Sequence, residues 1–170
     1  MATFAGGCEK APNAAAPAVS KAATQPVQRI SEIRPKFVES QPFVLGGKCN
    51  METVNGMAWG AEVVDVDPGM ALKVTGWAVD GERKMHPQNI SFRVQDAAGK
   101  EYYAVADMVS RQDVAEFFKE DYYSKGGYKV VVDLSALPAG HYSAMVVMDV
   151  GGKSILCASG RSFSLKGALR

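Results

Sequence analysis

Two histidines are the side chains of this chain best suited to acid–base catalysis near neutral pH. His86 lies in the polar stretch RKMHPQ, and His141 stands at the start of a predicted strand, where the neighbouring Tyr142 is expected to point inward. A hydrolase would also need an activated nucleophile, and the G-x-S-x-G pattern that presents a serine on a sharp turn is absent from the sequence. The glycine pairs lack the helix that follows a phosphate-binding loop, so we interpret them as turns. The sequence therefore predicts two surface histidines and no catalytic residue.

A metal site would need a cluster of ligands, and one carboxylate-rich stretch resembles such a cluster. Glu62, Asp65 and Asp67 lie together in AEVVDVDPG. Calcium prefers oxygen-rich loops of this kind, but the spacing does not match the EF-hand pattern. The two histidines are far apart in the sequence, and a histidine-based site would need carboxylates that the pattern does not place. We therefore predict a solvated strand end at AEVVDVDPG, no metal ligand and no cofactor.

Aromatic side chains give the best indication of a binding surface. Tyrosines gather in the sequence on both sides of a predicted helix: Tyr102, Tyr103, Tyr122, Tyr123 and Tyr128. If Tyr102, Tyr122 and Tyr123 are exposed together, they form a flat platform for a sugar or a protein partner. Tyrosine is also common in strands, so the alternative is that these rings pack in the core. Trp59 and Trp77 are expected in the core.

Composition and charge exclude several classes of protein. Of the 170 residues, 47% are hydrophobic and 22% are charged, which is ordinary for a globular domain. The net charge of +1 argues against a nucleic-acid partner and against electrostatic binding to a membrane surface. No apolar run approaches the roughly 18 residues of a transmembrane helix.

From residue 50 onward the hydrophobic pattern predicts strands separated by short turns. Apolar and polar residues alternate over 70–79 and 89–95, and further apolar segments cover 101–109, 128–134, 141–150 and 153–165. Short turns between neighbouring strands predict an antiparallel sheet. One helix is predicted at about 111–120, with Ser110 and Asp113 as a capping box and with Val114, Phe117 and Phe118 on one face.

The stretch DLSALPAGHYSAMVV (133–147) predicts a corner between two strands, in which the Tyr142 ring covers the core and its hydroxyl binds backbone a few residues upstream. Together with GWAVD (76–80), RQDVAEFF (111–118), GGYKVVVDLSALPAGHY (126–142) and the final strand, it resembles the immunoglobulin-like and fibronectin-type domains of bacterial envelope proteins. The resemblance implies a mainly β fold: an antiparallel Ig-like β-sandwich of about seven strands with one short helical insertion. The sandwich is expected to span residues 46–168.

Residues 1–45 differ in composition from the rest of the chain. FAGGC (4–8) resembles the lipobox of bacterial lipoproteins, which implies lipidation of Cys8. Met1 is followed by no basic or apolar signal region, so the true start is expected upstream, and the alternative is a free cysteine in a disordered tail. The alanine- and proline-rich residues 9–28 predict a flexible tether, and residues 29–45 are transitional and offer apolar side chains that could dock on the domain.

The other two cysteines flank the predicted sandwich. Cys49 precedes the first strand and Cys157 lies in the last, and the Ig-like resemblance places these strands side by side. We therefore expect a Cys49–Cys157 disulfide, with two buried free thiols as the alternative. A disulfide implies an oxidising compartment.

These patterns favour a noncatalytic, envelope-associated Ig-like domain, periplasmic or on the surface, that binds a partner protein or a surface glycan. Its membrane contact would be limited to the lipid on Cys8. One alternative is a structural or accessory subunit of an envelope assembly. The other is a metal-dependent or hydrolytic enzyme, which would require His86 or His141 to meet carboxylates in a cleft.

Overall fold

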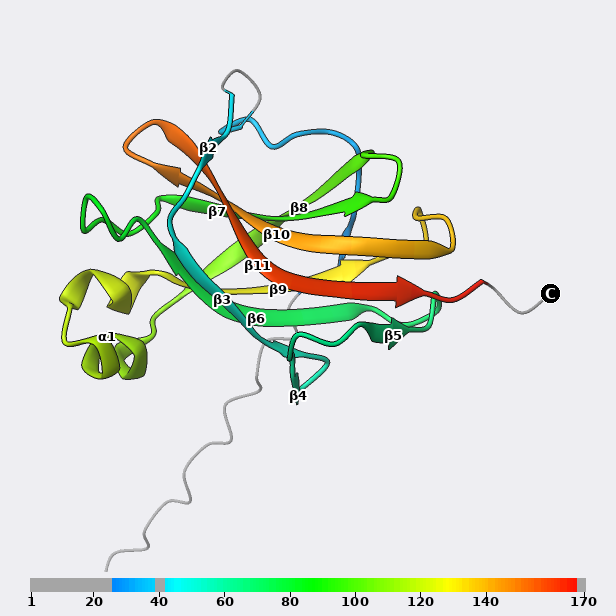
Figure 1. The fold of residues 1–170 in the computed structure, drawn as a ribbon, viewed down its shortest axis with the longest axis horizontal. Coiled ribbons are helices and arrows are strands. Elements are labelled where there is room, and N and C mark those ends of the chain that lie inside the picture. Colours follow the sequence, from blue (N-terminus) through cyan, green and yellow to red (C-terminus); the bar gives the residue numbers. More distant parts are fainter. Residues whose placement is uncertain (1–25, 39–41, 168–170) are drawn as a thin grey trace, which may run out of the picture.

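The computed structural model describes residues 26–38 and 42–167, so Cys8 and most of the predicted tether lie outside the described residues. The described chain is mainly β, with an open, mixed sheet of 11 strands (Figure 1). In chain order the elements are β1 (Gln28–Arg29), β2 (Val44–Leu45), β3 (Lys48–Val54), β4 (Met57–Ala58), β5 (Val64–Val66), β6 (Leu72–Val79), β7 (Asn89–Asp96), β8 (Glu101–Val109), α1 (Gln112–Phe118), the 3₁₀ helix η1 (Asp121–Lys125), β9 (Gly127–Asp133), β10 (Gly140–Val150) and β11 (Lys153–Leu165).

The long strands pair as the short turns predict, in the order β2-β11-β10-β7-β8-β9-β6-β3-β4. The prediction of a purely antiparallel sheet is wrong, because β1 pairs in parallel with β9, and β2 and β5 pair in parallel with β11. These strands have two or three residues each and belong to connecting segments rather than to hairpins. Seven strands have seven residues or more, and the four shorter ones raise the number above the predicted seven.

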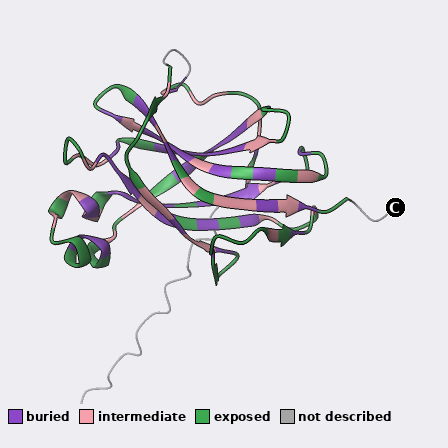
Figure 2. Cartoon of the chain, viewed as in Figure 1, coloured by how far each residue is buried: buried purple, intermediate pink, exposed green. Residues whose placement is uncertain are grey.

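Strand β8 joins two halves of the sheet. Its residues 101–106 pair with β7, whereas residues 107–109 pair with β9. After Lys129, β9 no longer pairs with β8. Its residues Val132 and Asp133 pair instead with β1. The sheet therefore curls, and side chains from both halves, such as Phe92, Val130 and Val146, share one hydrophobic core. Figure 2 shows the resulting alternation of buried and exposed residues along β6.

A disulfide closes the curled sheet, as predicted. Cys49 in β3 and Cys157 in β11 are bonded, with a Cα–Cα distance of 6.3 Å, although the two strands lie near opposite ends of the hydrogen-bonded path. Arg161 adds a second link, because its Nε donates to the Met51 carbonyl at 3.3 Å and its Nη2 donates to Asn50 Oδ1 at 3.1 Å. A β-bulge between Ala158 and Arg161 makes this reach possible, since it interrupts the pairing of β11 with β10.

The folded unit begins before residue 46, where the sequence placed the domain boundary. An N-terminal segment, residues 26–38, packs on the outer face of the sheet. Its Val38 is buried on that face beside Tyr103, its Ile30 joins the main core, and Ser31 forms backbone hydrogen bonds with Tyr103 in both directions. The transitional segment therefore docks on the domain because its apolar side chains cover a face that would otherwise be exposed.

The predicted corner is present between β9 and β10. The Tyr142 hydroxyl donates to the Pro138 carbonyl at 2.7 Å, and its ring stacks on Phe163 with centroids 5.3 Å apart. Leu134 and Leu137 are buried beneath the turn. The hydrogen bond and the ring together fix the direction in which β10 leaves the corner.

The helix lies within the predicted range, but the predicted capping box is wrong. The residue that precedes α1 is Arg111 rather than Ser110, and no side chain caps the helix. Asp113 is instead engaged by the Arg111 guanidinium. The helix ends at Phe118, and the following residue, Lys119, adopts a left-handed conformation with φ of 55°.

Two buried tyrosines predict opposite effects of the same substitution. Tyr142→Phe should lower the free energy of unfolding by about 1 kcal/mol, because it removes a hydrogen bond to backbone. Tyr128→Phe should be neutral or stabilising, because the Tyr128 hydroxyl is buried with no hydrogen-bond partner among the described protein atoms. Thermal unfolding of the two variants measures this. If Tyr128→Phe lowers the free energy of unfolding more than Tyr142→Phe does, the hydrogen bonding described for the two hydroxyl groups is contradicted.

Reduction of the disulfide should destabilise the domain strongly. The bridge spans a sequence separation of 108 residues, and a cross-link of this length is worth about 4.7 kcal/mol in the chain-entropy model. Urea unfolding with and without reductant measures the loss, with Cys8→Ser in every sample so that no third thiol exchanges. The double variant Cys49→Ala/Cys157→Ala should unfold at the same urea concentration as the reduced protein, and reductant should not change its midpoint. Equal midpoints with and without reductant would refute the expectation.

Candidate functional site

A groove of about 380 Å³ lies between β3, β6 and the α1 helix. We define the groove as the space lined by Asn50, Glu52, Trp77, Arg111, Asp113, Val114, Phe117 and Phe118. Asn50 and Glu52 come from β3, Trp77 comes from β6, and the remaining side chains come from the start and body of α1. The groove therefore forms where the helical insertion meets one end of the sheet.

One side of the groove is aromatic. The Trp77 ring meets Phe118 edge-on at a centroid distance of 5.3 Å, and Phe118 stacks on Tyr123 at 4.5 Å. Phe117 contacts Phe118 at 5.0 Å but has an exposed fraction of 79%. The helix has seven residues and buries Val114 and Ala115 against the domain, and at about 100° per residue Phe118 lies over that buried face while Phe117 turns toward solvent. A large exposed aromatic side chain beside a groove is typical of a binding surface.

The other side of the groove is charged and is organised by Arg111. Its Nε donates to Asp113 Oδ1 at 2.9 Å, its Nη2 donates to Asp113 Oδ2 at 2.7 Å and to Glu52 Oε1 at 3.2 Å, and its Nη1 donates to the other Glu52 oxygen. Hydrogen bonds from Arg111 to Asp113 and Glu52 raise the pKa of Arg111, and the hydrogen bond from Arg111 lowers the pKa of Asp113. Arg111 and Asp113 are therefore ionised at neutral pH, and neither has the proton affinity of a general acid or base.

The tyrosines predicted to form an exposed platform do not do so. Tyr102 is buried in the main core, with Lys100 over its ring, because its position on β8 points inward. Tyr123 is buried beneath the helix, and Tyr122 is half-buried against the Tyr123 ring. The three tyrosines therefore do not form one exposed surface. Trp59 lies in the core as expected, whereas Trp77 is only partly buried and lines the groove.

The polar residues considered for catalysis or metal binding lie elsewhere. His141 is exposed and shares a hollow of about 220 Å³ with Asp96, Ser143 and Ser162, but it forms no hydrogen bond or ion pair with them in the described part of the chain. The backbone amides of Ala98 and Lys100 occupy Asp96 Oδ1. These contacts do not form a catalytic triad.

The other histidine and the carboxylate-rich stretch also stand apart from the groove. His86 is half-buried in the loop before β7, and Glu62 is exposed. Asp65 and Asp67 lie 3.7 Å and 3.8 Å from the Lys166 ammonium. Within residues 26–38 and 42–167, no three histidine, cysteine or acidic side chains form a group that could hold a metal ion. None of the helices in these residues is long and apolar enough to cross a membrane.

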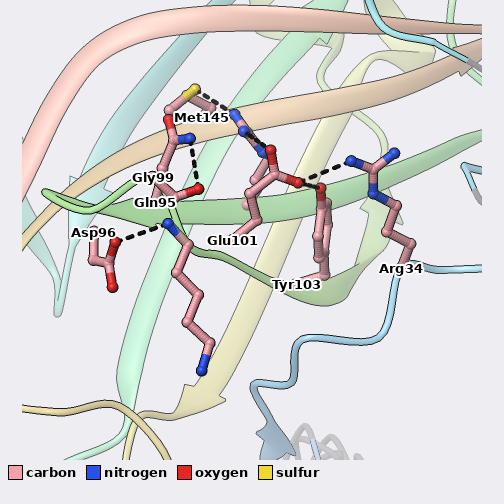
Figure 3. A network of polar contacts seen from close by, with 9 residues as sticks. Arg34, Gln95, Asp96, Gly99, Glu101, Tyr103 and Met145 are labelled. Atoms are coloured by element: carbon pink, nitrogen blue, oxygen red, sulfur yellow. Dashed lines mark hydrogen bonds and ion pairs between the residues drawn. The ribbon is translucent and has the colours of Figure 1, made fainter.

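A second polar cluster, centred on Glu101, holds the N-terminal segment to the sheet (Figure 3). Glu101 accepts hydrogen bonds from Arg93 at 2.5 Å, from Arg34 at 3.1 Å and from the Tyr103 hydroxyl. Arg93 is almost fully buried, and Arg34 belongs to the N-terminal segment and lies over the Phe43 ring at 4.9 Å. Burial alone would raise the pKa of Glu101, but the hydrogen bonds from Tyr103, Arg93 and Arg34 outweigh it and lower the pKa. The contacts give this cluster a structural role.

The residues of the groove were only partly foreseen. The sequence pointed to aromatic side chains around the helix, but it assigned Phe117 and Phe118 to a packed helical face and gave Glu52 no role. Adjacent aromatic residues in a helix lie about 100° apart, so a seven-residue helix that already buries Val114 and Ala115 does not bury both. The angle between Phe117 and Phe118 on the helix could therefore have shown from the sequence that one of the two rings is exposed. Glu52 gives no signal because its partner Arg111 is distant in the sequence.

Comparisons with models of protein families, with curated proteins and with solved structures gave no match. The Ig-like and lipoprotein resemblances therefore stay predictions. The geometry of the groove is the basis on which a function can be proposed.

The Glu101 cluster predicts a specific loss of stability in acid. Because its pKa is lowered on folding, Glu101 stabilises the fold fully above the ordinary pKa of 4.5, and this contribution is lost as the pH falls through the lowered value. Glu101→Gln should cost about 3 kcal/mol at neutral pH, since it leaves the buried Arg93 without a counter-charge.

The measurement is urea unfolding of the wild type and of Glu101→Gln across a pH series below neutral. The variant should show a shallower decrease in stability in acid than the wild type. Glu62→Gln, a change at an exposed carboxyl group, is the matched control and should behave like the wild type. Parallel pH profiles for the wild type and Glu101→Gln would show that Glu101 does not carry the acid sensitivity.

Proposed function

We propose that this chain is a noncatalytic binding domain of the bacterial cell envelope and that the groove holds a surface glycan. The observation that carries the proposal is the pairing of an exposed aromatic wall, formed by Trp77, Phe117 and Phe118, with charged and amide groups on the opposite side. Aromatic rings pack against the C–H faces of sugar rings. Carboxylates, amides and guanidinium groups are partners for the hydroxyl groups at the ring edge.

The size of the groove favours a glycan over a protein partner. Sites for small ligands are concave and typically measure about 300–1,000 Å³, and the groove at about 380 Å³ lies within this range. A stable protein interface buries about 800 Å² on each partner. The exposed apolar side chains next to the groove, Phe117 and Phe118, are few for a surface of that size.

The envelope location is proposed from the cysteines. A structural disulfide is typical of proteins that fold in an oxidising compartment, and Cys49–Cys157 is such a bond. Lipidation of Cys8 would tether the domain to a membrane and leave the groove free to meet glycans. A protein that binds no glycan would instead fit the alternative of an accessory subunit in an envelope assembly.

We also propose that the curled sheet is a variant of the Ig-like sandwich. The Tyr142–Pro138 hydrogen bond at the corner between β9 and β10 supports this relationship, as do seven long strands around one core. The parallel pairs of β1, β2 and β5 would be additions to the sandwich at strand positions that the long strands leave unpaired.

Phe117→Ala should weaken glycan binding by about tenfold, since the loss of an exposed aromatic contact of about 1.4 kcal/mol corresponds to that factor. Affinity electrophoresis against envelope polysaccharides, followed by calorimetry with oligosaccharides of the polysaccharide that binds, measures the effect. Leu45→Ala is the matched control, because Leu45 is 78% exposed, like Phe117, but lies on β2 away from the groove. Equal losses for both variants, or no glycan binding by the wild type, would refute the proposal.

A further inference from the structure

The groove presents more hydrogen-bond acceptors than donors to a ligand. Two carboxylates, Glu52 and Asp113, face one guanidinium, that of Arg111, so one negative charge is in excess on the groove lining. The aromatic wall provides apolar contacts that any sugar ring can make, so it does not distinguish one sugar from another. The charged side therefore decides which sugar is preferred.

Arg111 has little left to offer a ligand. A guanidinium has five N–H donors, and four hydrogen bonds already run from Arg111 to Glu52 and Asp113. A carboxylate has about four acceptor positions, so Glu52 and Asp113 keep free lone pairs after they bind Arg111. Asp113 has a side-chain exposure of 68%, which leaves these lone pairs accessible.

Asn50 is neutral, so it leaves the excess of one negative charge unchanged. Its Oδ1 accepts a hydrogen bond from Arg161, which leaves its amide N–H groups as the donors for a ligand. Arg161 itself does not line the groove, because its guanidinium is engaged by the Met51 and Ser159 carbonyls and by Asn50. A ligand in the groove thus meets accessible carboxylates and an aromatic wall.

We propose that the glycan carries free amino groups, as in a hexosamine polymer from which N-acetyl groups have been removed. The inference rests on the proposed glycan-binding function and specifies its sugar class. An ammonium group supplies three donors and a positive charge that balances the second carboxylate of the Glu52 and Asp113 pair, since Arg111 balances only one. The faces of Trp77 and Phe118 also attract cations. An N-acetyl group replaces that charge with a neutral amide and adds an acceptor.

The test compares glucosamine oligomers with N-acetylglucosamine oligomers of equal length and with a neutral glucose oligomer, by calorimetry at a pH where the amine is protonated. The glucosamine oligomer should bind about tenfold more tightly than the acetylated one, the factor expected when a charge-assisted hydrogen bond is added. Added salt should weaken the binding of the glucosamine oligomer more than that of the others.

Asp113→Asn removes a negative charge at an exposed position together with one of the two oxygens that accept from Arg111, so it should weaken binding of the glucosamine oligomer about fivefold and weaken binding of the acetylated oligomer less. Asp65→Asn is the matched control, because Asp65 has a similar side-chain exposure of 66% and lies outside the groove. It should bind like the wild type.

The outcomes separate this inference from the proposed function. The inference is overturned if the glucosamine and acetylated oligomers bind with equal affinity, or if the acetylated or neutral oligomer binds more tightly. In that case, weaker binding of the same oligomer by Phe117→Ala would still support the proposed function. Binding of no oligomer overturns the inference, and binding of no envelope polysaccharide by the wild type overturns the proposed function as well. Tighter binding of the glucosamine oligomer that is lost equally in Asp113→Asn and Asp65→Asn overturns the assignment to the groove.

Discussion

The structure depends on the closure of an open sheet. A sheet that curls around one core brings its two ends together, and here β3 and β11, each next to an end of the hydrogen-bonded path, meet without a backbone ladder between them. The Cys49–Cys157 bond and the two hydrogen bonds from Arg161 to β3 take the place of that ladder. Strands β2 and β5 pair with the two ends of β11, so its middle residues are the ones left to face β3. Closure therefore relies on side-chain links at a position where backbone pairing is absent.

The outer face of the sheet presents a second constraint, which the N-terminal segment resolves. Arg93 points away from the core from β7 and is almost fully buried, although a charged side chain is costly to remove from water without a partner. Glu101 supplies the partner, and Arg34 and Phe43 cover the pair from outside. The apolar part of the same cover joins Val38 to Tyr103 and Val147. The N-terminal segment is consequently part of the fold, because without it a buried ion pair and an apolar surface would face solvent.

The sequence predicted the elements with strong periodicity and missed those defined by contacts between distant residues. Alternation of apolar and polar residues located β6 and β7, and apolar segments between turns located β8, β9, β10 and β11. The corner pattern located the Tyr142 hydrogen bond. Strands of two or three residues carry no period, so β1, β2, β4 and β5 could not be recognised. For Tyr102 the sequence left a surface platform and core packing both open, because clustering in the sequence does not fix which face of β8 it occupies, and the structure shows core packing. Glu52 was overlooked because its role exists only through Arg111, which is 59 residues away.

The groove and the closure of the sheet share strand β3, and this links the stability of the fold to the geometry of the groove. Cys49 bonds to β11, the adjacent Asn50 binds Arg161 and lines the groove, and Glu52 holds Arg111 at the start of the helix. The disulfide therefore fixes the strand that carries the charged side of the groove, while α1 carries the aromatic side. The Arg111 backbone N–H also donates to the Ser124 carbonyl in η1, so Arg111 joins the two helices of the insertion to each other and, through Glu52, to strand β3. The proposed ligand would therefore meet a groove whose walls are already held in place, and its binding would not require the chain to be ordered first.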